Sequence, residues 1–256
     1  MIRIVGRIGY VVVILLALVG ITSIVARFVG TVQFLADPSA VDVTANAPPG
    51  AEGFDERYYA HPYLTLVHIL VGFLFMVLGP IQFWPAVRNR WIRYHRWAGR
   101  VWMIAALVGV TSALLFVPVL PVFGSFSTRV AVVFASLMFL VCLAQGYRRI
   151  RHRQIAQHRE WMIRTFAIGL GISTFRVMIP FLMMPPLNAT FPEAWDTVVW
   201  LAFAVNVIVA EAWINVTRRQ PQPVPRTAPI REHVLQTTRA VRSFSIRPSR
   251  ASGEGD

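Results

Sequence analysis

Six long apolar stretches alternate with short polar segments along the chain, and arginines are concentrated in every second polar segment. Each stretch is close to the ~20 residues that a helix needs to cross a ~30 Å hydrocarbon layer. The hydrophobic share of 55% and the mean hydropathy of +0.55 lie outside the usual range of a soluble domain. The sequence therefore predicts an all-α, polytopic membrane helix bundle. The predicted spans are roughly Ile8–Gly30, Tyr63–Trp84, Trp97–Pro121, Arg129–Tyr147, Trp161–Met184 and Trp195–Val216.

The distribution of arginines predicts how these spans are oriented. Arg3 and Arg7 precede the first span, and larger arginine clusters follow the second and fourth spans. The alternate gaps contain acids such as Asp37 and Glu193. Because positive residues stay on the cytoplasmic side of short loops, we expect a bacterial inner-membrane (cytoplasmic-membrane) protein with both termini in the cytoplasm. The two clusters are Arg88, Arg90, Arg93, Arg96 and Arg100, and Arg148, Arg149, Arg151, Arg153 and Arg159.

The net charge of +13 comes from these basic loops and from the arginine-rich C-terminal segment. Anionic lipid headgroups are the nearest partners for such loops, so the charge favours contact with the bilayer surface over nucleic-acid binding. Residues 1–217 are predicted to form the six-helix transmembrane domain. Residues 218–256 are rich in Pro, Gln, Arg, Ser and Thr, which is typical of a disordered basic tail, here on the cytoplasmic side.

A weak internal repeat connects two of the basic segments. The motif His95-Arg96-Trp97 precedes the third span, and His158-Arg159-Glu160-Trp161 occupies the corresponding place before the fifth. The helical hairpins Tyr63–Leu120 and Arg129–Met183 are therefore candidates for two copies of one unit, as in other membrane bundles.

Polar residues within the predicted spans are the candidates for function, because ionisable groups in lipid are costly and usually face the bundle interior. At a rise of ~1.5 Å per residue they fall into two layers. The outer layer contains His68 and Arg176. The inner layer contains His95, Arg100, His158, Arg164, Gln82, Gln145 and Glu211.

The inner layer suggests a b-type haem. His95 and His158 lie on different helices at one depth, beside small residues, and imidazole is a ligand of haem iron. Arg100 and Arg164 could neutralise the haem propionates, and such a protein would exchange electrons with a quinone or a redox partner. The alternative is that both histidines are interfacial residues that bind headgroup phosphates or loop carbonyls.

The outer layer suggests a different function, that of a non-enzymatic carrier or assembly factor. Arg176 has no obvious acidic partner within the membrane, so we expect it and His68 to contact a small anion or a lipid phosphate. Pro180 predicts a kink near Arg176, whose carbonyl loses its helical hydrogen bond. An alternative is a Zn or Cu site formed by His61, His68 and the loop acids Asp55 or Glu56, but these residues match no recognised metal-ligand spacing. A hydrogen bond from His68 to Arg176 or to a carbonyl explains the buried histidine more simply than a metal does.

Glu211 belongs to the inner layer, where its natural partners are Arg164 or Arg100. A structural ion pair and a role in proton relay are both open interpretations. Catalysis without a cofactor ranks behind the two other functions, because the chain has no nucleophile–base arrangement and no HExxH-type motif.

The spaced polar motifs carry a resemblance to a known family. His68-x-x-x-Gly72, Gly79-Pro80-x-Gln82 and His95-Arg96-Trp97-x-Gly99-Arg100 resemble domain-of-unknown-function family 2306, a set of predicted bacterial membrane proteins. The resemblance covers about residues 63–211 and implies a multi-helix membrane domain with no assigned activity. The layout is also loosely similar to b-type cytochromes, although the outer histidine pair of a two-haem path is incomplete. The other matching motifs are His158-x-x-Trp161-Met162-x-Arg164, Arg176 with Pro180, and Asn206-x-x-x-x-Glu211.

Overall fold

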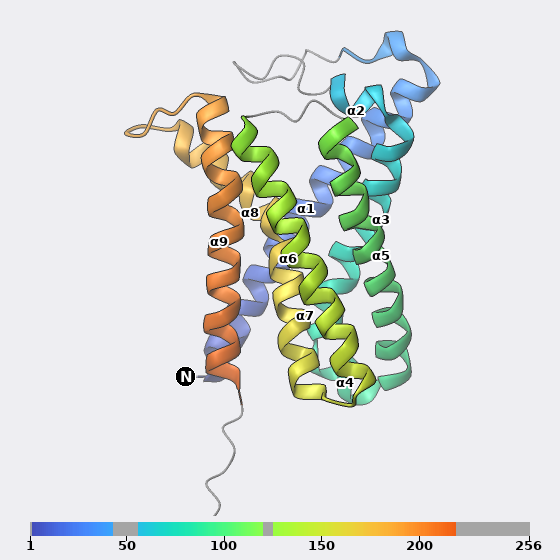
Figure 1. The fold of residues 1–256 in the computed structure, drawn as a ribbon, viewed down its shortest axis with the longest axis vertical. Helices are drawn as coiled ribbons and strands as arrows, with labels where there is room; N and C mark the ends of the chain where they lie inside the picture. Colours follow the sequence, from blue (N-terminus) through green and yellow to red (C-terminus); the bar gives the residue numbers. More distant parts are fainter. Residues whose placement is uncertain (1, 43–55, 120–124, 219–256) are drawn as a thin grey trace, which may run out of the picture. The chain divides into compact units, whose positions relative to one another are not determined.

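The computed structural model describes residues 2–42, 56–119 and 125–218, and no strand occurs among them. The predicted tail from residue 219 onward and the loop acid Asp55 lie outside these ranges. The long helices lie side by side and pack as a bundle (Figure 1). The elements are α1 (Ile2–Ala36), η1 (Pro38–Ala40), α2 (Glu56–Ala60), α3 (Pro62–Phe83), α4 (Pro85–Arg90), α5 (Ile92–Val119), α6 (Phe126–Arg151), α7 (Ile155–Gly169), α8 (Gly171–Met183) and α9 (Phe191–Thr217).

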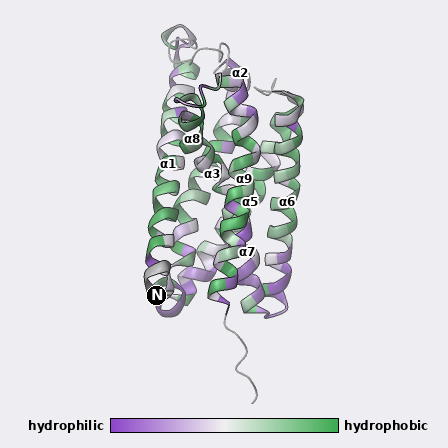
Figure 2. Cartoon of the chain, turned by 90° about the vertical axis from the view of Figure 1, so that its left-hand side faces the viewer, coloured by the Kyte–Doolittle hydropathy of each residue, from purple (hydrophilic) through white to green (hydrophobic). Residues whose placement is uncertain are grey.

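The described part of the chain contains five to six candidate spans. Five single helices, α1, α3, α5, α6 and α9, are long and apolar enough to cross a membrane, and α7 with α8 adds a sixth, bent span if that pair crosses as one. The polytopic helical bundle is therefore confirmed. Hydrophobic residues predominate along the long helices, whereas hydrophilic residues gather at the lower end of the bundle (Figure 2).

One end of the bundle carries most of the arginines, and we call it the arginine-rich end. It contains the start of α1, the short helix α4, the connection from α6 to α7 and the end of α9 (Figure 1). Helix α6 ends in Arg148, Arg149 and Arg151, where cations interact favourably with the negative end of the helix dipole. The first arginine cluster lies on α4 and on the first turns of α5.

A cluster of aromatic rings forms the core near the arginine-rich end. The rings of Phe75 and Trp102 stack with centroids 4.7 Å apart, and Phe166 lies 5.5 Å from Phe75 and 6.2 Å from Trp102. The indole N–H of Trp102 donates to the carbonyl of Phe75 at 3.0 Å, which satisfies the polar group of a buried side chain. Helices α3, α5 and α7 are thus joined through three large side chains.

The fifth span is broken at Leu170, where α7 and α8 meet at an angle of 40°. The sequence predicted the kink at Pro180 instead, which lies inside α8. The side chain of Asn206 on α9 connects the two half-helices: its Nδ2 donates to the Ala167 carbonyl at 3.0 Å, and its Oδ1 accepts from Thr174 Oγ1 at 3.0 Å. The break is therefore stabilised by a neighbouring helix, as interruptions within a membrane must be.

Candidate functional sites

His158 lies in the first turn of α7 and is held by the end of α6. Its Nδ1 lies 2.8 Å from the carbonyl oxygen of Gly146. A carbonyl oxygen only accepts hydrogen bonds, so Nδ1 carries a proton. In the neutral ring, Nε2 then has a free lone pair, and no described residue bonds to it.

His95 lies in the first turns of α5 and is held by Gln82, at the end of α3. The amide Nε2 of Gln82 lies 3.2 Å from the His95 carbonyl, and its Oε1 lies 3.2 Å from the N–H of Gly99. These two backbone groups assign the orientation of the amide. The same amide nitrogen lies 2.9 Å from His95 Nδ1, to which it donates. Glycine at position 99 lets Gln82 approach, because an added side chain would lie 3.3 Å from that amide.

The two histidines therefore form a pair, which we call the His95–His158 pair, near the arginine-rich end. Both side chains are half-buried, and they are close enough to interact electrostatically. Two turns further along α5 and α7, Trp102 and Phe166 are in ring contact. Gln82 on α3 orients His95, and Gly146 on α6 orients His158, so each histidine is held by the long helix that precedes it in the chain.

Arg164 and Arg100, the predicted propionate partners, have different surroundings. Arg164 is bound to Glu211 by two contacts, at 2.5 Å and 2.9 Å, and lies over the ring of Trp161 at 4.7 Å. The sequence predicted Arg164 or Arg100 as the partner of Glu211, and in the structure the partner is Arg164. Arg100 is exposed on α5.

A haem between His95 and His158 fits these surroundings only in part. His158 presents an Nε2 lone pair, as an iron ligand must. His95 accepts at Nδ1 from Gln82, which places the proton of the neutral ring on Nε2, the atom that would bind iron. In addition, Arg164 is already paired with a carboxylate, and stacked aromatic side chains fill the space further along α5 and α7.

A second group of polar residues lies toward the other end of the bundle. His68 on α3 contacts Ser112 on α5, with 2.8 Å between Nδ1 and Oγ. Because the Ser112 hydroxyl donates to the Gly109 carbonyl at 2.8 Å, it accepts from His68. The sequence predicted Arg176 or a carbonyl as the partner of His68; the structure gives this hydroxyl, and the backbone of Gly109 also interacts with the imidazole.

Arg176 lies on α8 and has no carboxylate partner within the described residues. Its Nη1 donates to the Ile172 carbonyl at 3.1 Å, one turn back toward the break at Leu170. The guanidinium is thus directed along the span, and it is close enough to His68 to interact electrostatically. Asp196, an acid near the start of α9, accepts from the N–H of Ser125 and from the hydroxyl of Thr128.

Two residues near Arg176 were missed by the sequence analysis. Arg27 on α1 lies 4.3 Å from the ring centroid of Tyr58 on α2, and both interact electrostatically with Arg176. An arginine inside the first apolar stretch was the available signal for Arg27. The Arg176 cluster comprises Arg27, Tyr58, His68, Ser112 and Arg176.

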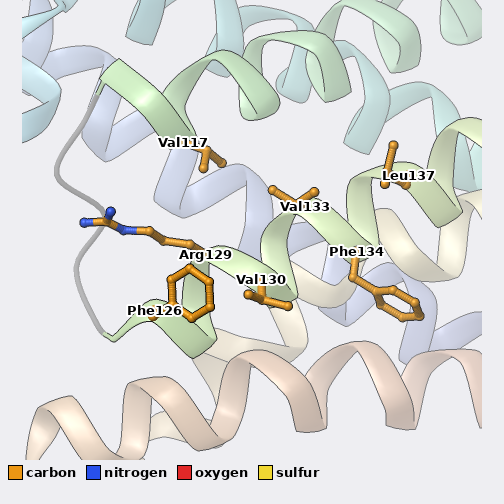
Figure 3. Close-up of a pocket in the computed structure, with 7 residues that line it drawn as sticks. All are labelled: Val117, Phe126, Arg129, Val130, Val133, Phe134 and Leu137. Atoms are coloured by element: carbon orange, nitrogen blue, oxygen red, sulfur yellow. The ribbon is translucent and has the colours of Figure 1, made fainter.

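No group of three His, Cys, Asp or Glu side chains that could hold a metal occurs within residues 2–42, 56–119 and 125–218. A hollow lies between α5 and α6, and its lining is almost entirely hydrophobic. The side chain of Arg129 extends away from Val133, Phe134 and Leu137 (Figure 3), so the hollow offers lipid chains an apolar surface.

Comparison with known proteins places these sites in a family. The model of the family described as "Predicted membrane protein (DUF2306)" matches residues 65–214, more than half of the chain. The chain belongs to the DUF2306 family. A search of curated proteins and of solved structures found no match.

The DUF2306 match includes the candidate residues of both polar layers, from His68 to Glu211. It begins after Arg27 and Tyr58, so α1 and α2 add to the Arg176 cluster from outside the matched region. The family description states a membrane protein and no activity.

Proposed function

We propose that this integral membrane protein is a non-enzymatic carrier or assembly factor that binds an anionic group at the Arg176 cluster. One observation carries the proposal: Arg176 lies within a membrane span, without a described carboxylate partner. A charge at this depth costs several kcal/mol unless an anion or water compensates it. A phosphate or carboxylate ligand would supply that compensation.

The neighbours of Arg176 suit an anion. Arg27 adds a second guanidinium from another helix, and guanidinium groups bind phosphate and carboxylate oxygens through paired hydrogen bonds. His68 is fixed at Nδ1 by Ser112, so Nε2 is the ring nitrogen left to contact a ligand. Arg176 is exposed on the surface of the protein, so a ligand can reach it without opening the bundle.

The proposed orientation of the chain implies the side from which the ligand arrives. The positive-inside rule supports an orientation with the arginine-rich end, and both termini, in the cytoplasm of a bacterial inner membrane. The Arg176 cluster then lies in the outer half of the bilayer. A small anion would reach it from the external solution, and a lipid phosphate from the outer leaflet.

Thermal stability in detergent tests the proposal. Wild-type protein, Arg176→Gln and a control, Arg129→Gln, are titrated with inorganic phosphate and, separately, with a short-chain anionic phospholipid. Arg129 is an exposed arginine at the start of α6, in the same half of the bundle. We expect the ligand-induced rise in melting temperature to be smaller in Arg176→Gln than in the wild type and to be unchanged in Arg129→Gln. Equal rises in all three proteins, or none in the wild type, would refute the proposal.

A b-type haem held by His95 and His158 is the second candidate, favoured by the Nε2 lone pair of His158. When bound, a haem would supply one-electron redox chemistry, in exchange with a quinone or a redox partner. Absorption spectra of oxidised and reduced protein test this candidate. It requires a Soret band that is lost in both His95→Ala and His158→Ala, and colourless protein from haem-replete cells would exclude it.

A further inference from the structure

In the His95–His158 pair, the two Nε2 atoms have opposite hydrogen-bonding roles. Gly146 fixes the proton of His158 on Nδ1, so Nε2 of the neutral ring accepts. Gln82 donates to Nδ1 of His95, so Nε2 of that neutral ring carries the proton and donates. Both assignments depend on backbone carbonyl oxygens, which cannot change roles.

The two rings do not satisfy each other. No described residue bonds to either Nε2, and no hydrogen bond joins the rings, although they are close enough to interact electrostatically. Both side chains are half-buried, so a small group can reach them. A ligand that fits here must accept one hydrogen bond from His95 and donate another to His158.

The surrounding charges narrow the class of ligand. Arg88 and Arg96 interact electrostatically with His95, and Arg88 also interacts with Arg159 on α7. Arg159 is held in place by a 2.9 Å hydrogen bond to Thr217 on α9. Two guanidinium groups, those of Arg88 and Arg96, are thus close enough to interact with His95, the donor of the pair, which suits an anion that also carries a proton.

The geometry points to a binding site for a protonated phosphate between His95 and His158. One phosphate oxygen accepts from His95 Nε2, the P–OH group donates to His158 Nε2, and the neighbouring arginines balance the negative charge. Inorganic phosphate and the phosphomonoester headgroup of a lipid share this chemistry. This site lies at the arginine-rich end and does not rest on the proposed function of Arg176.

Sulfate supplies the decisive comparison, because it matches phosphate in size and charge but carries no proton at neutral pH. In detergent-purified protein we expect phosphate to bind about tenfold more tightly than sulfate, since sulfate leaves the His158 acceptor without a hydrogen bond. In His158→Phe the preference should fall to about twofold or less. The control His152→Phe alters an exposed histidine of the same basic segment and should keep the full preference.

The lipid source is tested in parallel. Short-chain phosphatidic acid is a phosphomonoester with a P–OH group, whereas phosphatidylglycerol is a phosphodiester without one. Preference for phosphate over sulfate alone identifies free phosphate as the ligand, and preference for phosphatidic acid alone identifies a lipid headgroup. The Arg176→Gln variant should retain the preference for the ligand that carries a P–OH group. This result separates the His95–His158 site from the Arg176 cluster. A wild-type protein that discriminates in neither comparison overturns the proposal.

Ring ¹⁵N NMR gives a readout that needs no substitution at the pair. With ¹⁵N-histidine labelling and variants such as His152→Phe for assignment, we expect the Nε2–H form for His95 and the Nδ1–H form for His158. Nδ1–H on both rings would overturn the phosphate site, and it would restore His95 as a candidate iron ligand.

Discussion

Glu211 on α9 binds the guanidinium of Arg164 on α7 through both carboxylate oxygens, with Nε–Oε1 and Nη2–Oε2 distances of 2.5 Å and 2.9 Å. The Arg164 side chain is 19% exposed and that of Glu211 41%. The contact joins two spans that are far apart in sequence, and the bidentate geometry is the strong form of a charged hydrogen bond.

Removing one partner of this pair should therefore destabilise the bundle. Glu211→Gln leaves the Arg164 charge without its counter-ion, and we expect a loss of about 1–2 kcal/mol, less than for a fully buried pair because Glu211 is partly exposed. Thermal unfolding in detergent measures the loss. If the pair is structural, Arg164→Gln combined with Glu211→Gln should cost less than the sum of the two single changes. Strict additivity would contradict direct coupling.

Gly79 should not tolerate a side chain. A Cβ at this position would overlap the ring of Phe166, which is enclosed by the aromatic core. Overpacking of this kind typically costs about 1–3 kcal/mol, so Gly79→Ala should lower the melting temperature. Gly6→Ala is the matched control, because nothing lies within 4 Å of a Cβ there. Similar melting temperatures for the two variants would show that the core can yield at Phe166.

Asn206 should be needed to hold the break in the fifth span. In Asn206→Leu the Ala167 carbonyl and the Thr174 hydroxyl lose their partner in a buried place, and we expect a cost of about 1–3 kcal/mol. Asn215→Leu alters an exposed asparagine of the same helix and should have little effect. Thermal unfolding of the two variants measures this cost. Equal stability of Asn206→Leu and Asn215→Leu would argue against a role of Asn206 in stabilising the break.

The membrane orientation predicts which residues react with an impermeant thiol reagent in intact cells. The variants His152→Cys and Leu187→Cys each introduce one exposed cysteine. Position 152 lies at the arginine-rich end and position 187 at the other end of the bundle. The native Cys142 is buried and should remain unlabelled. We expect labelling at position 187 only, with position 152 reacting after the cells are opened. The opposite pattern would place the arginine-rich end outside.

Span positions and the Arg164–Glu211 pair could be predicted from the sequence, because both follow from hydrophobic length and from the depth of charged residues. The site of the break could not. Pro180 removes one hydrogen bond near the end of a helix, which the helix accommodates. At Gly169 and Gly171 the rings of Phe75 and Phe203 lie against the backbone, and this depends on helices distant in the sequence.

The partners of the histidines were also beyond sequence reasoning. Ser112 and Gly146 are ordinary span residues, and only the packing of α5 against α3 and of α7 against α6 brings them to His68 and His158. Gln82 was assigned to the right layer, but its contact with His95 requires the close approach that Gly99 permits.

The interruption at Leu170 gives the two halves of the fifth span partly different neighbours, with α9 common to both. Helix α7 packs against α6 and α9, whereas α8 packs against α9 and α1. A small rotation of α8 would therefore move Arg176 without displacing His158, since the backbone between them is not one continuous helix. Amide hydrogen exchange would register this independence as faster exchange around Gly171 than in the unbroken middle of α6, and each half of the bundle could respond to its own ligand.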